Sequence, residues 1–394
     1  MISQWAFAAE DFAGCVDRLK ERALQASISE SVVLETLSGV QHVPRVIELD
    51  RKQPEFYQSF YTYYGQRVTE NRIELGRDLL RQNYALLQRL ERKYGVPGNY
   101  LVAFWGMETN FGRYLGNMNT LDSLATLACD KRRSEFFTLE LLDALRLIDS
   151  GVTTQDKMRG SWAGAMGNMQ FMPSTFRAYG VDANSDGEID LWGNLNDAFT
   201  SAAYYLSQLG WQAGWRWGRE VLLPKSFDYR LSGRSQRRTL KEWAELGLKD
   251  RYQRPIPALD EKATLIVPAG HRGPAFLVYK NFNVMMKWNL SEFYALSVGV
   301  LADRINGASD LRVAPPQTRN LSVAEVADVQ RRLNALGLNA GVVDGVFGSI
   351  TKQALQQYQV RHGLVADGFL DAEVIDQLMA QPVVSDPPVD NSNR

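Results

Sequence analysis

Histidine and cysteine are scarce in this sequence, with 3 His and 2 Cys among 394 residues. His42, His271 and His362 lie far apart, so they have none of the spacings of a Cys/His zinc cluster. Zinc and thiol chemistry are therefore not expected. We expect Cys15 and Cys129 to be separate buried thiols, with one disulfide between them as the alternative.

An excess of charge of one sign is also missing, because 44 Lys and Arg face 45 Asp and Glu and the formal net charge is −1. A protein that holds nucleic acid needs a basic surface, so nucleic acid is not an expected partner. No apolar run reaches the roughly 20 residues of a membrane-spanning helix, and the first ten residues lack the pattern of a signal peptide. If the protein is exported, its signal is absent from this chain.

The composition is otherwise that of a globular protein, with 45% hydrophobic and 11% aromatic residues. The length favours two or more domains. Amphipathic helical runs, such as 77–94 and 134–148, dominate up to about residue 210. Short β-type segments separated by Pro and Gly follow between about 219 and 283. We therefore predict a mainly α (α+β) protein in which a helical domain carries a small inserted β-rich subdomain.

The end of the sequence has a different organisation. A polar stretch with Pro315 and Pro316 predicts a linker, and a weak repeat follows in which a helix leads into an Asp-Gly turn, first at Asp344 and then at Asp367. The repeat predicts a small helical bundle. The predicted division is a catalytic region at 1–305, a linker at 306–322, a bundle at 323–380 and a disordered tail at 381–394.

One acidic residue interrupts an apolar stripe. A helix is predicted over residues 100–111, and on it Glu108 shares a face with Leu101, Phe104 and Phe111. Poor solvation raises the pKa of a glutamic acid, which keeps a proton available for general acid cleavage of a glycosidic bond. The structural alternative is a buried Glu108 that pairs with Arg113 or with a backbone group.

A glycine-rich segment at 160–173 carries the next candidates. Glycines allow a backbone to approach a ligand closely, and the side chains of Ser161 and Gln170 can hydrogen-bond a polar substrate. Close helix packing at small residues is the alternative. A serine nucleophile is excluded because the spacing of a nucleophile elbow is missing and no histidine is indicated as its base.

A short acidic segment carries oxygen-bearing side chains at alternate positions, namely Asp182, Asn184, Asp186 and Glu188. With Gly187 at the sharp turn, it reproduces the first half of a calcium-binding EF-hand loop. Position 12 of that loop is Gly193, so the final ligand has to come from further along, and Asp197 is the nearest acid. The alternative is a turn rich in Asp and Asn without a metal.

Four segments, in the family's order, resemble the B-type lytic murein transglycosylases. They are WGMETNFG at 105–112, GSWAGAMGNMQFMPS at 160–174, the acidic segment at 182–190 and KNFNVMMKWNLSEFYA at 280–295. The similarity covers about residues 1–305. Four ordered segments are far more specific than any single one.

The resemblance implies an exported, periplasmic bacterial enzyme with a lysozyme-like helical fold. Its partner would be the glycan strands of peptidoglycan, cleaved at the β-1,4 bond between MurNAc and GlcNAc, and protein partners are not identified by the sequence. No cofactor is implied for the reaction, and a structural Ca²⁺ is implied for the acidic segment. Glu108 matches the family's catalytic acid/base, and the family's substrate-binding residues correspond to Tyr63, Ser161, Gln170, Asn289 and Tyr294. At Trp288 a family tyrosine is replaced, which keeps a stacking ring but removes a hydroxyl.

As the family implies, one carboxylate performs two steps. Glu108 would protonate the leaving oxygen and then take the proton of the 6-hydroxyl, while the MurNAc N-acetyl group stabilises C1, so that the product ends in 1,6-anhydroMurNAc. Two alternatives stay open. A hydrolytic muramidase would use a second acid, with Asp122 or Asp130 as candidates. A non-catalytic murein-binding protein would keep Glu108 for structure only.

The predicted bundle resembles the small helical peptidoglycan-binding domain of wall enzymes, with DGVFGSIT at 344–351 as its recognisable core. This resemblance implies a separable module that tethers the enzyme to an insoluble substrate. The alternative is a packing module without a ligand.

Overall fold

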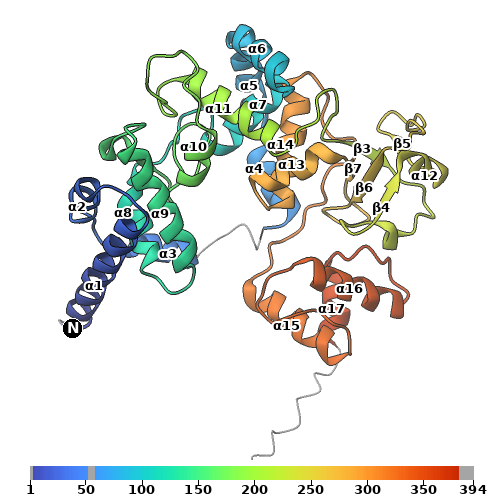
Figure 1. The fold of residues 1–394 in the computed structure, drawn as a ribbon. Coiled ribbons are helices and arrows are strands. Elements are labelled where there is room, and N and C mark those ends of the chain that lie inside the picture. Colours follow the sequence, from blue (N-terminus) through green and yellow to red (C-terminus); the bar gives the residue numbers. More distant parts are fainter. Residues whose placement is uncertain (1–2, 52–57, 381–394) are drawn as a thin grey trace, which may run out of the picture. The chain divides into compact units, whose positions relative to one another are not determined.

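The fold is described from a computed structural model, which describes residues 3–51 and 58–380 (Figure 1). The predicted tail at 381–394 lies outside the described residues. The chain forms two compact units. Among the described residues, the helical unit comprises 3–51, 69–214 and 298–308, and the mixed unit comprises 58–68, 215–297 and 309–380. Each unit is described by itself below.

The helical unit is built mainly of α-helices joined by short loops. They are α1 (Ser3–Gln25), α2 (Glu30–Leu37), α3 (Pro44–Arg51), α5 (Glu70–Gln82), α6 (Tyr84–Tyr94), α7 (Gly98–Thr109), α8 (Thr120–Ala128), α9 (Ser134–Asp149), α10 (Pro173–Tyr179), α11 (Leu195–Gln208) and the second half of α14 (Glu292–Ile305). A short antiparallel pair, β1 (Met118–Asn119) and β2 (Arg159–Gly160), joins two loops of this unit.

Helix α7 lies at the centre of the helical unit and packs against α5, α6 and α11. Every residue from Gly98 to Met107 is buried, which suits its apolar and aromatic sequence. The helix starts after Pro97 and ends at Thr109, two residues earlier than the sequence pattern predicts. Gly106 is needed here, because a Cβ at this position would lie 2.8 Å from the ring of Phe111.

A disulfide joins Cys15 of α1 to Cys129 at the end of α8, with their Cα atoms 6.0 Å apart. The prediction of two separate thiols is wrong. Both α1 and α8 pack against α9, which brings together cysteines that lie 114 residues apart in the sequence. By chain-entropy arguments a bond that closes a loop of this length stabilises the fold by up to about 4–5 kcal/mol.

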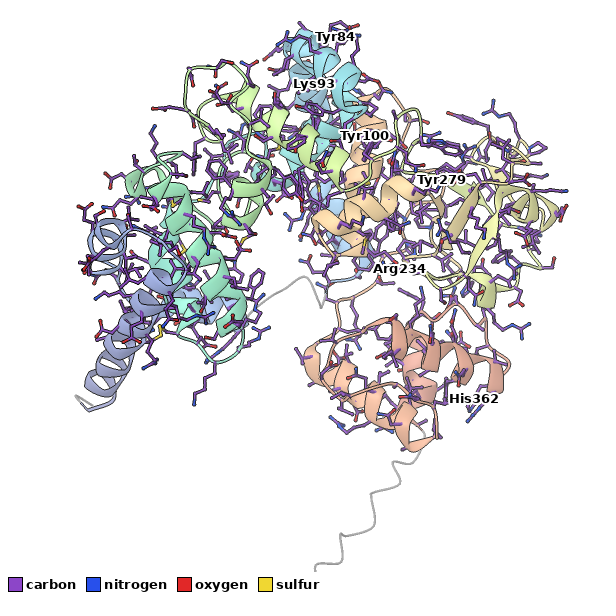
Figure 2. The ribbon with its side chains drawn as sticks, in the orientation of Figure 1. Tyr84, Lys93, Tyr100, Arg234, Tyr279 and His362 are labelled. Carbon is purple, nitrogen blue, oxygen red and sulfur yellow. A yellow bond between two sulfur atoms is a disulfide. The ribbon has the colours of Figure 1, made fainter. Side chains whose placement is uncertain are left out.

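The mixed unit contains the predicted β-rich insertion. Its antiparallel sheet has the order β4-β6-β7-β3-β5 and consists of β3 (Gly218–Leu222), β4 (Arg237–Thr239), β5 (Lys249–Asp250), β6 (Lys262–Ile266) and β7 (Ala275–Val278). With α12 (Leu240–Glu245), the sheet encloses an apolar core that includes Trp243, Leu265 and Leu277. Tyr279, labelled in Figure 2, is buried between β7 and α13 (Lys280–Trp288). These elements confirm the predicted fold class.

The C-terminal part of the mixed unit is a bundle of α15 (Val323–Ala335), α16 (Ser349–Arg361) and α17 (Ala372–Met379). Its core includes Leu333, Leu355, Tyr358 and Leu378. We call residues 323–379 the C-terminal module. Within the part of the chain that the structure describes, no helix is both long and apolar enough to cross a membrane.

The segment predicted as a linker, 306–322, contains neither helix nor strand, and all of it is described. The backbone N–H groups of Arg312 and Val313 both donate to the carboxylate of Glu220, at 2.9 Å. The N–H of Ser59 donates to Oδ1 of Asn320 at 2.8 Å. From Arg312 onward the segment is therefore hydrogen-bonded to other parts of the mixed unit.

Candidate active site

Glu108 lies in the last turn of α7 and is partly buried. Leu101, Phe104 and Phe111 are buried as the predicted stripe requires. Arg113 is exposed and forms no ion pair with any described residue, so Arg113 does not neutralise Glu108 in the structure, and the alternative of a backbone partner for Glu108 stays open. The acid is thus held on the apolar central helix of the unit.

The backbone directly after Glu108 is strained. Asn110, Phe111 and Gly112 have φ angles of 50°, 61° and 79° in succession. Left-handed conformations at non-glycine residues cost on the order of 1–2 kcal/mol each and tend to cluster at functional sites. The N–H of Phe111 donates to the Trp105 carbonyl at 3.2 Å, and the two rings meet edge-on with centroids 5.6 Å apart. These contacts stabilise an abrupt end of the helix one residue beyond Thr109.

Asn168 is a buried amide that the sequence reasoning missed. Its Oδ1 accepts from Trp105 Nε1 at 2.7 Å, and its backbone carbonyl lies 3.1 Å from the Thr109 hydroxyl. The same hydroxyl accepts from the N–H of Gly112 at 2.9 Å. Asn168 therefore contacts the residues on either side of Glu108 in the last two turns of α7.

The other face of Asn168 binds the chain beyond the acidic segment. Its Nδ2 donates to the carbonyls of Leu191 and Trp192, at 3.1 and 2.8 Å, and its N–H donates to Leu191 at 2.8 Å. Only 3% of Asn168 is exposed, so each of these groups needs a protein partner. An asparagine among apolar residues in the glycine-rich segment was the signal that could have identified it.

The glycine-rich segment forms tight β-bridges, and it also packs on a helix, because a Cβ at Gly164 would lie 2.7 Å from the side chain of Leu124 on α8. Gly160 pairs with Met166, and Met166 pairs with Phe171. A Cβ at Gly160 would lie 2.0 Å from the Ala165 carbonyl oxygen, and one at Gly116 would lie 2.1 Å from the carbonyl oxygen of Gly160. Only glycine allows these backbones to approach so closely.

Ser161 and Gln170 are held by backbone groups and keep further hydrogen-bonding capacity. The Ser161 hydroxyl accepts from the N–H of Ala165 at 3.1 Å, so its own hydrogen is still available to donate. Gln170 Nε2 donates to the carbonyls of Leu115 and Gly167, both at 3.0 Å, and its Oε1 has no partner among the described residues. Both side chains are partly exposed and can therefore hydrogen-bond a ligand.

Glu140 of α9 is a second residue that the sequence reasoning missed. Its carboxylate accepts from the N–H of Ser174 at 2.9 Å and from the Ser174 hydroxyl at 2.7 Å. Burial raises the pKa of Glu140 above its usual range, although both hydrogen bonds oppose the shift. The contact fixes the first turn of α10, directly after the segment that carries Gln170.

The remaining predicted substrate-binding residues lie in the mixed unit. Tyr63 of α4 (Phe60–Arg67) is buried, with its ring 6.0 Å from Phe293. Trp288 is partly exposed at the end of α13, and Asn289 follows it and caps the turn by accepting from the N–H of Ser291 at 3.0 Å. Tyr294 is buried in the first turn of α14.

The predicted site residues therefore form two sets. Glu108, Ser161 and Gln170 belong to the helical unit, where Asn168 and the Leu115 carbonyl connect their segments. Tyr63, Trp288, Asn289 and Tyr294 belong to the mixed unit. Each set is described within its own unit.

The acidic segment forms a loop around its own carboxylates. Asp182 accepts from the N–H groups of Ser185, Asp186 and Gly187, and Gly187 has a φ of 91°. Asp197 is fully buried and accepts from the N–H groups of Ala183 and Asp190, one at each end of the loop. Burial raises the pKa of Asp197 above its usual range, although the hydrogen bonds from Ala183 and Asp190 oppose the shift.

The chemistry of this loop fits a hard cation, because every candidate ligand is an oxygen. The carboxylate of Glu188 pairs with Lys157 at 3.0 Å, which leaves the backbone carbonyl as the ligand that position 7 of such loops supplies. Within residues 3–51 and 58–380, however, no three His, Cys, Asp or Glu side chains gather as a metal-binding group. The oxygen ligands of the loop fit calcium, but in this structure the carboxylates of Asp182 and Asp197 accept hydrogen bonds from backbone N–H groups of the loop.

The two acids considered for hydrolysis have different environments. Asp130 pairs with Arg51 at 3.0 Å and accepts from the N–H of Arg132 at the same distance, so its carboxylate is held in a structural contact. Asp122 accepts from the N–H of Gln41 at 2.8 Å, and burial raises its pKa.

Comparison with known proteins places these features in a family. The family model of the transglycosylase SLT domain matches residues 11–303, and that of a peptidoglycan-binding domain matches residues 322–378. Membrane-bound lytic murein transglycosylase B of Escherichia coli K12 is 31% identical over 249 residues, which cover 62% of this chain and 66% of that protein. The chain thus spans slightly less than two thirds of the length of this curated relative.

Solved structures agree with this assignment. SltB3 from Pseudomonas aeruginosa, in complex with NAG-anhNAM-pentapeptide, is 40% identical with a TM-score of 0.90, over 93% of this chain and 99% of that one. Escherichia coli Slt35 in complex with calcium is 27% identical with a TM-score of 0.64, over 74% of this chain and 92% of that one. The resemblance identified from the sequence is confirmed: the chain belongs to the transglycosylase SLT domain family and carries a peptidoglycan-binding domain at its C-terminal end.

Proposed function

We propose that this protein is a peptidoglycan lytic transglycosylase that cleaves the β-1,4 bond between MurNAc and GlcNAc and leaves 1,6-anhydroMurNAc ends. The observation that carries this proposal is the position of Glu108, which is partly buried at the strained end of an apolar central helix. Asn168, two residues before Gln170, is hydrogen-bonded to the last two turns of that helix. The relatives that match are peptidoglycan enzymes by name, and one is solved with a muropeptide.

One carboxyl group is enough for this reaction. Glu108 in its protonated form donates its proton to the glycosidic oxygen as the bond from that oxygen to C1 breaks. The N-acetyl group of MurNAc stabilises the positive charge on C1. The Glu108 carboxylate then removes the proton of the 6-hydroxyl, and O6 bonds to C1. No water enters, and Glu108 ends in the protonation state in which it began.

The chain's other residues position the sugar. The Ser161 hydroxyl and Gln170 Oε1 have hydrogen-bonding capacity that neighbouring backbone groups leave unused, so they suit the polar groups of the glycan. In the mixed unit the half-exposed ring of Trp288 suits stacking against a sugar face, and Asn289, Tyr294 and Tyr63 are proposed as further contacts.

The proposal includes three further points that rest on the relatives. A structural Ca²⁺ would be held by Asp182, Asn184, Asp186, the carbonyl of Glu188 and Asp197, as the calcium complex of Slt35 suggests. The ion would stabilise the loop and take no part in the reaction. The protein would act in the periplasm, where peptidoglycan lies, and residues 306–322 would connect the catalytic region to the wall-binding module.

Replacement of one residue tests the proposal. Glu108→Gln keeps the shape of the side chain but cannot cycle a proton, so cleavage of purified peptidoglycan should fall by a factor of about 100 or more while the melting temperature stays near that of the wild type. Glu91→Gln is the matched control, because Glu91 is exposed on α6, and it should cleave normally. Substantial cleavage by folded Glu108→Gln protein would contradict the role of Glu108.

A further inference from the structure

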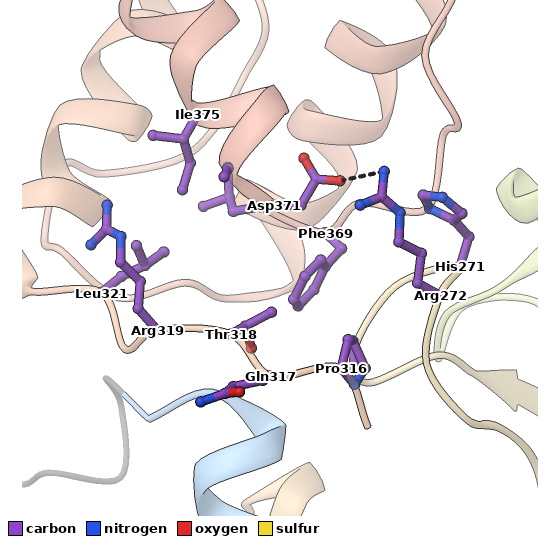
Figure 3. Close-up of a pocket in the computed structure, with 13 residues that line it drawn as sticks. His271, Arg272, Pro316, Gln317, Thr318, Arg319, Leu321, Phe369, Asp371 and Ile375 are labelled. Atoms are coloured by element: carbon purple, nitrogen blue, oxygen red, sulfur yellow. Dashed lines mark ion pairs between the residues drawn. The ribbon is translucent and has the colours of Figure 1, made fainter. Parts of the chain in front are cut away.

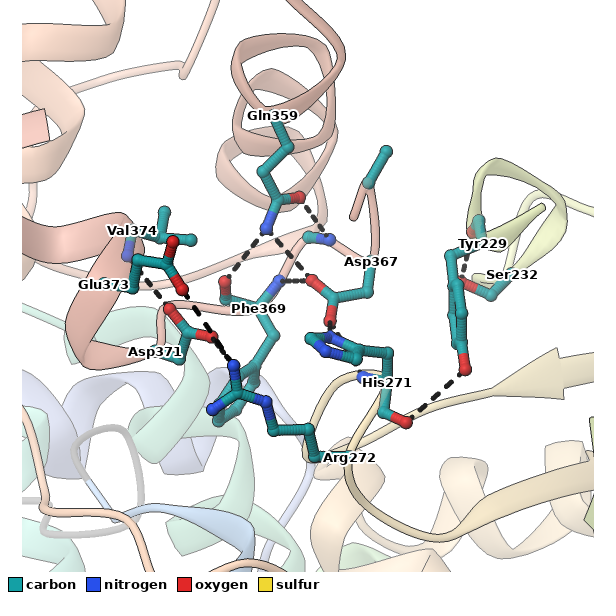
Figure 4. Close-up of polar contacts among 12 residues, drawn as sticks. Tyr229, Ser232, His271, Arg272, Gln359, Asp367, Phe369, Asp371, Glu373 and Val374 are labelled. Atoms are coloured by element: carbon teal, nitrogen blue, oxygen red, sulfur yellow. Dashed lines mark hydrogen bonds and ion pairs between the residues drawn. The ribbon is translucent and has the colours of Figure 1, made fainter. Parts of the chain in front are cut away.

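The C-terminal module is hydrogen-bonded to the β-rich insertion through one of its two Asp-Gly turns, the one at Asp367. Asp367 Oδ2 accepts from both the N–H and, in the fitting tautomer, Nδ1 of His271, each at 2.8 Å (Figure 4). His271 follows Gly270, at which a Cβ would lie 2.7 Å from the same oxygen. Asp367 is only 3% exposed. Asp367 Oδ2 is therefore occupied by hydrogen bonds from His271 of the same chain.

Charged groups surround this contact. Arg272 lies 3.9 Å from Asp371 and 4.0 Å from Glu373, and its guanidinium makes no hydrogen bond with the described residues. A cavity of about 270 Å³ lies beside this contact and is lined by residues of the loop at 269–272, of the segment 316–321 and of the module, including Phe369 (Figure 3). The contact is thus a polar one, in which a carboxylate of the module binds the backbone of a loop.

The turn at Asp344 has the same internal hydrogen bonds. Gln330 Nε2 donates to Asp344 Oδ1 at 2.9 Å while its Oε1 accepts from the N–H of Gly345, as Gln359 does with Asp367 and Gly368. The N–H two residues after each aspartate donates to the same Oδ1, at 2.9 Å in both turns. The two turns are therefore structural equivalents.

The two turns differ in the contacts of Oδ2, the second carboxylate oxygen of each aspartate. Asp344 is exposed, and its Oδ2 has no partner among the residues that the structure describes. Oδ1 is fixed by two hydrogen bonds, so the direction of Oδ2 is fixed as well. This oxygen corresponds to the one that binds the backbone of His271.

Aliphatic side chains are exposed around Asp344. Val342 is 79% exposed, and Val343 and Ile350 are 40% and 54% exposed. A Cβ at Gly341 would lie 3.5 Å from Ile350, which shows that the two sides of this turn are adjacent. Exposed apolar side chains on both sides of a turn that also carries a fixed acceptor are a feature of interaction surfaces. We call Asp344 with these three residues the outer turn.

We propose that the outer turn binds a peptide stem of peptidoglycan, by accepting a main-chain N–H at Asp344 Oδ2 and packing small side chains of the stem on its aliphatic residues. The equivalent oxygen of Asp367 binds a main-chain N–H, which favours a peptide over a sugar. The exposed residues are aliphatic, whereas glycans stack on aromatic rings. The choice of a wall peptide rests on the proposed function.

Methyl NMR of the full chain tests this directly. The probes are the free stem pentapeptide and the disaccharide NAG-NAM without peptide. The pentapeptide should shift the methyl signals of Val342, Val343 and Ile350, and the disaccharide should not. Asp344→Asn keeps Oδ1 for the turn and replaces only Oδ2, so it should weaken the binding that these signals report about tenfold or more. Absent shifts, equal shifts with the disaccharide, or undiminished binding by Asp344→Asn would overturn the proposal.

Three further variants keep the test independent of folding defects and of the proposed activity. Asp376→Asn removes the same charge from an exposed position on α17 and should bind the peptide normally. Val342→Asn should weaken binding several-fold even if Asp344→Asn folds poorly, and unchanged binding would contradict the proposal.

Asp367→Asn should increase proteolysis at 306–322 and leave peptide binding intact. None of these measurements requires glycan cleavage, so a failed cleavage assay would affect the proposed function and not these binding results.

Discussion

Trp105 Nε1 donates a hydrogen bond to Asn168 Oδ1 at 2.7 Å, and both residues are almost fully buried. Trp105 is one turn before Glu108 on α7, and Asn168 lies two residues before Gln170. This bond connects the helix that carries the proposed acid with the segment that carries a proposed substrate ligand.

Replacing Asn168 with alanine should therefore impair catalysis as well as stability. The change leaves Trp105 Nε1 and the Trp192 carbonyl without their partner, at about 1–3 kcal/mol for each buried group, whereas the Leu191 carbonyl keeps the backbone N–H of residue 168. We expect a lower melting temperature and, at temperatures where the variant is folded, a fall in kcat of at least tenfold with a smaller change in KM.

Asn334→Ala is the control for this prediction. Asn334 also spans two backbone groups, by donating to Gly341 and accepting from Ala340, but it lies in the C-terminal module. It should destabilise the module and leave kcat on soluble glycans unchanged. An Asn168→Ala enzyme with normal kcat would show that Asn168 supports only the fold.

Calcium should raise the melting temperature of the protein through the loop at Asp182. An ion that binds only the folded state stabilises it by about 2.7 kcal/mol at a concentration 100 times its Kd. Asp186→Ala should abolish the shift, and Asp156→Ala, which removes an exposed acid outside the loop, should not. If neither calcium nor a chelator changes melting over a wide range of concentrations, the loop is a turn without a metal.

Acid should destabilise the start of α15 through Glu325. Hydrogen bonds from Ser322 and Arg319 lower the pKa of Glu325 from 4.5 to about 2. A depressed carboxylate pKa gives stability that is fully present above pH 4.5 and is lost as the pH falls through the folded value of about 2. The difference in melting temperature between the wild type and Glu325→Gln should therefore shrink over this range. A constant difference would show that the ionised cap does not contribute.

Truncation near Asn306 should reduce turnover of intact sacculi much more than turnover of short soluble glycans, because a wall-binding module raises the local concentration of bonds at the active site. Turnover assays with both substrates measure this. The module is also in direct contact with the mixed unit, because Asp367 accepts hydrogen bonds from His271, and its removal could therefore disturb that unit. Equal losses on both substrates would mean that the module supports the fold of the mixed unit instead of tethering the enzyme.

The sequence predicts the family and the fold class of this protein better than its long-range contacts. The helical and β-rich regions follow from local periodicity, and the apolar stripe around Glu108 is buried as its spacing predicts. The disulfide, the Asn168 contacts and the Glu140 bonds to Ser174 join residues from 23 to 114 positions apart. Such pairings depend on how helices pack, which single-residue patterns do not encode.

The Asp-Gly repeat is an intermediate case. Its two units are visible in the sequence, and their glutamine and aspartate side chains form the same hydrogen bonds in the structure. The sequence does not show that the surroundings of the two Asp-Gly turns differ, because His271, the partner of Asp367, lies in a loop 96 residues away.

The mass of the products released from purified peptidoglycan tests the central claim most directly. A transglycosylase moves O6 of MurNAc onto C1 without adding water, whereas a muramidase adds one water at each cleavage. We predict that the wild-type protein releases muropeptides that end in 1,6-anhydroMurNAc, each lighter by one water than the product of hydrolysis. Products that carry the added water would contradict the account and would direct attention to Asp122 as the second acid.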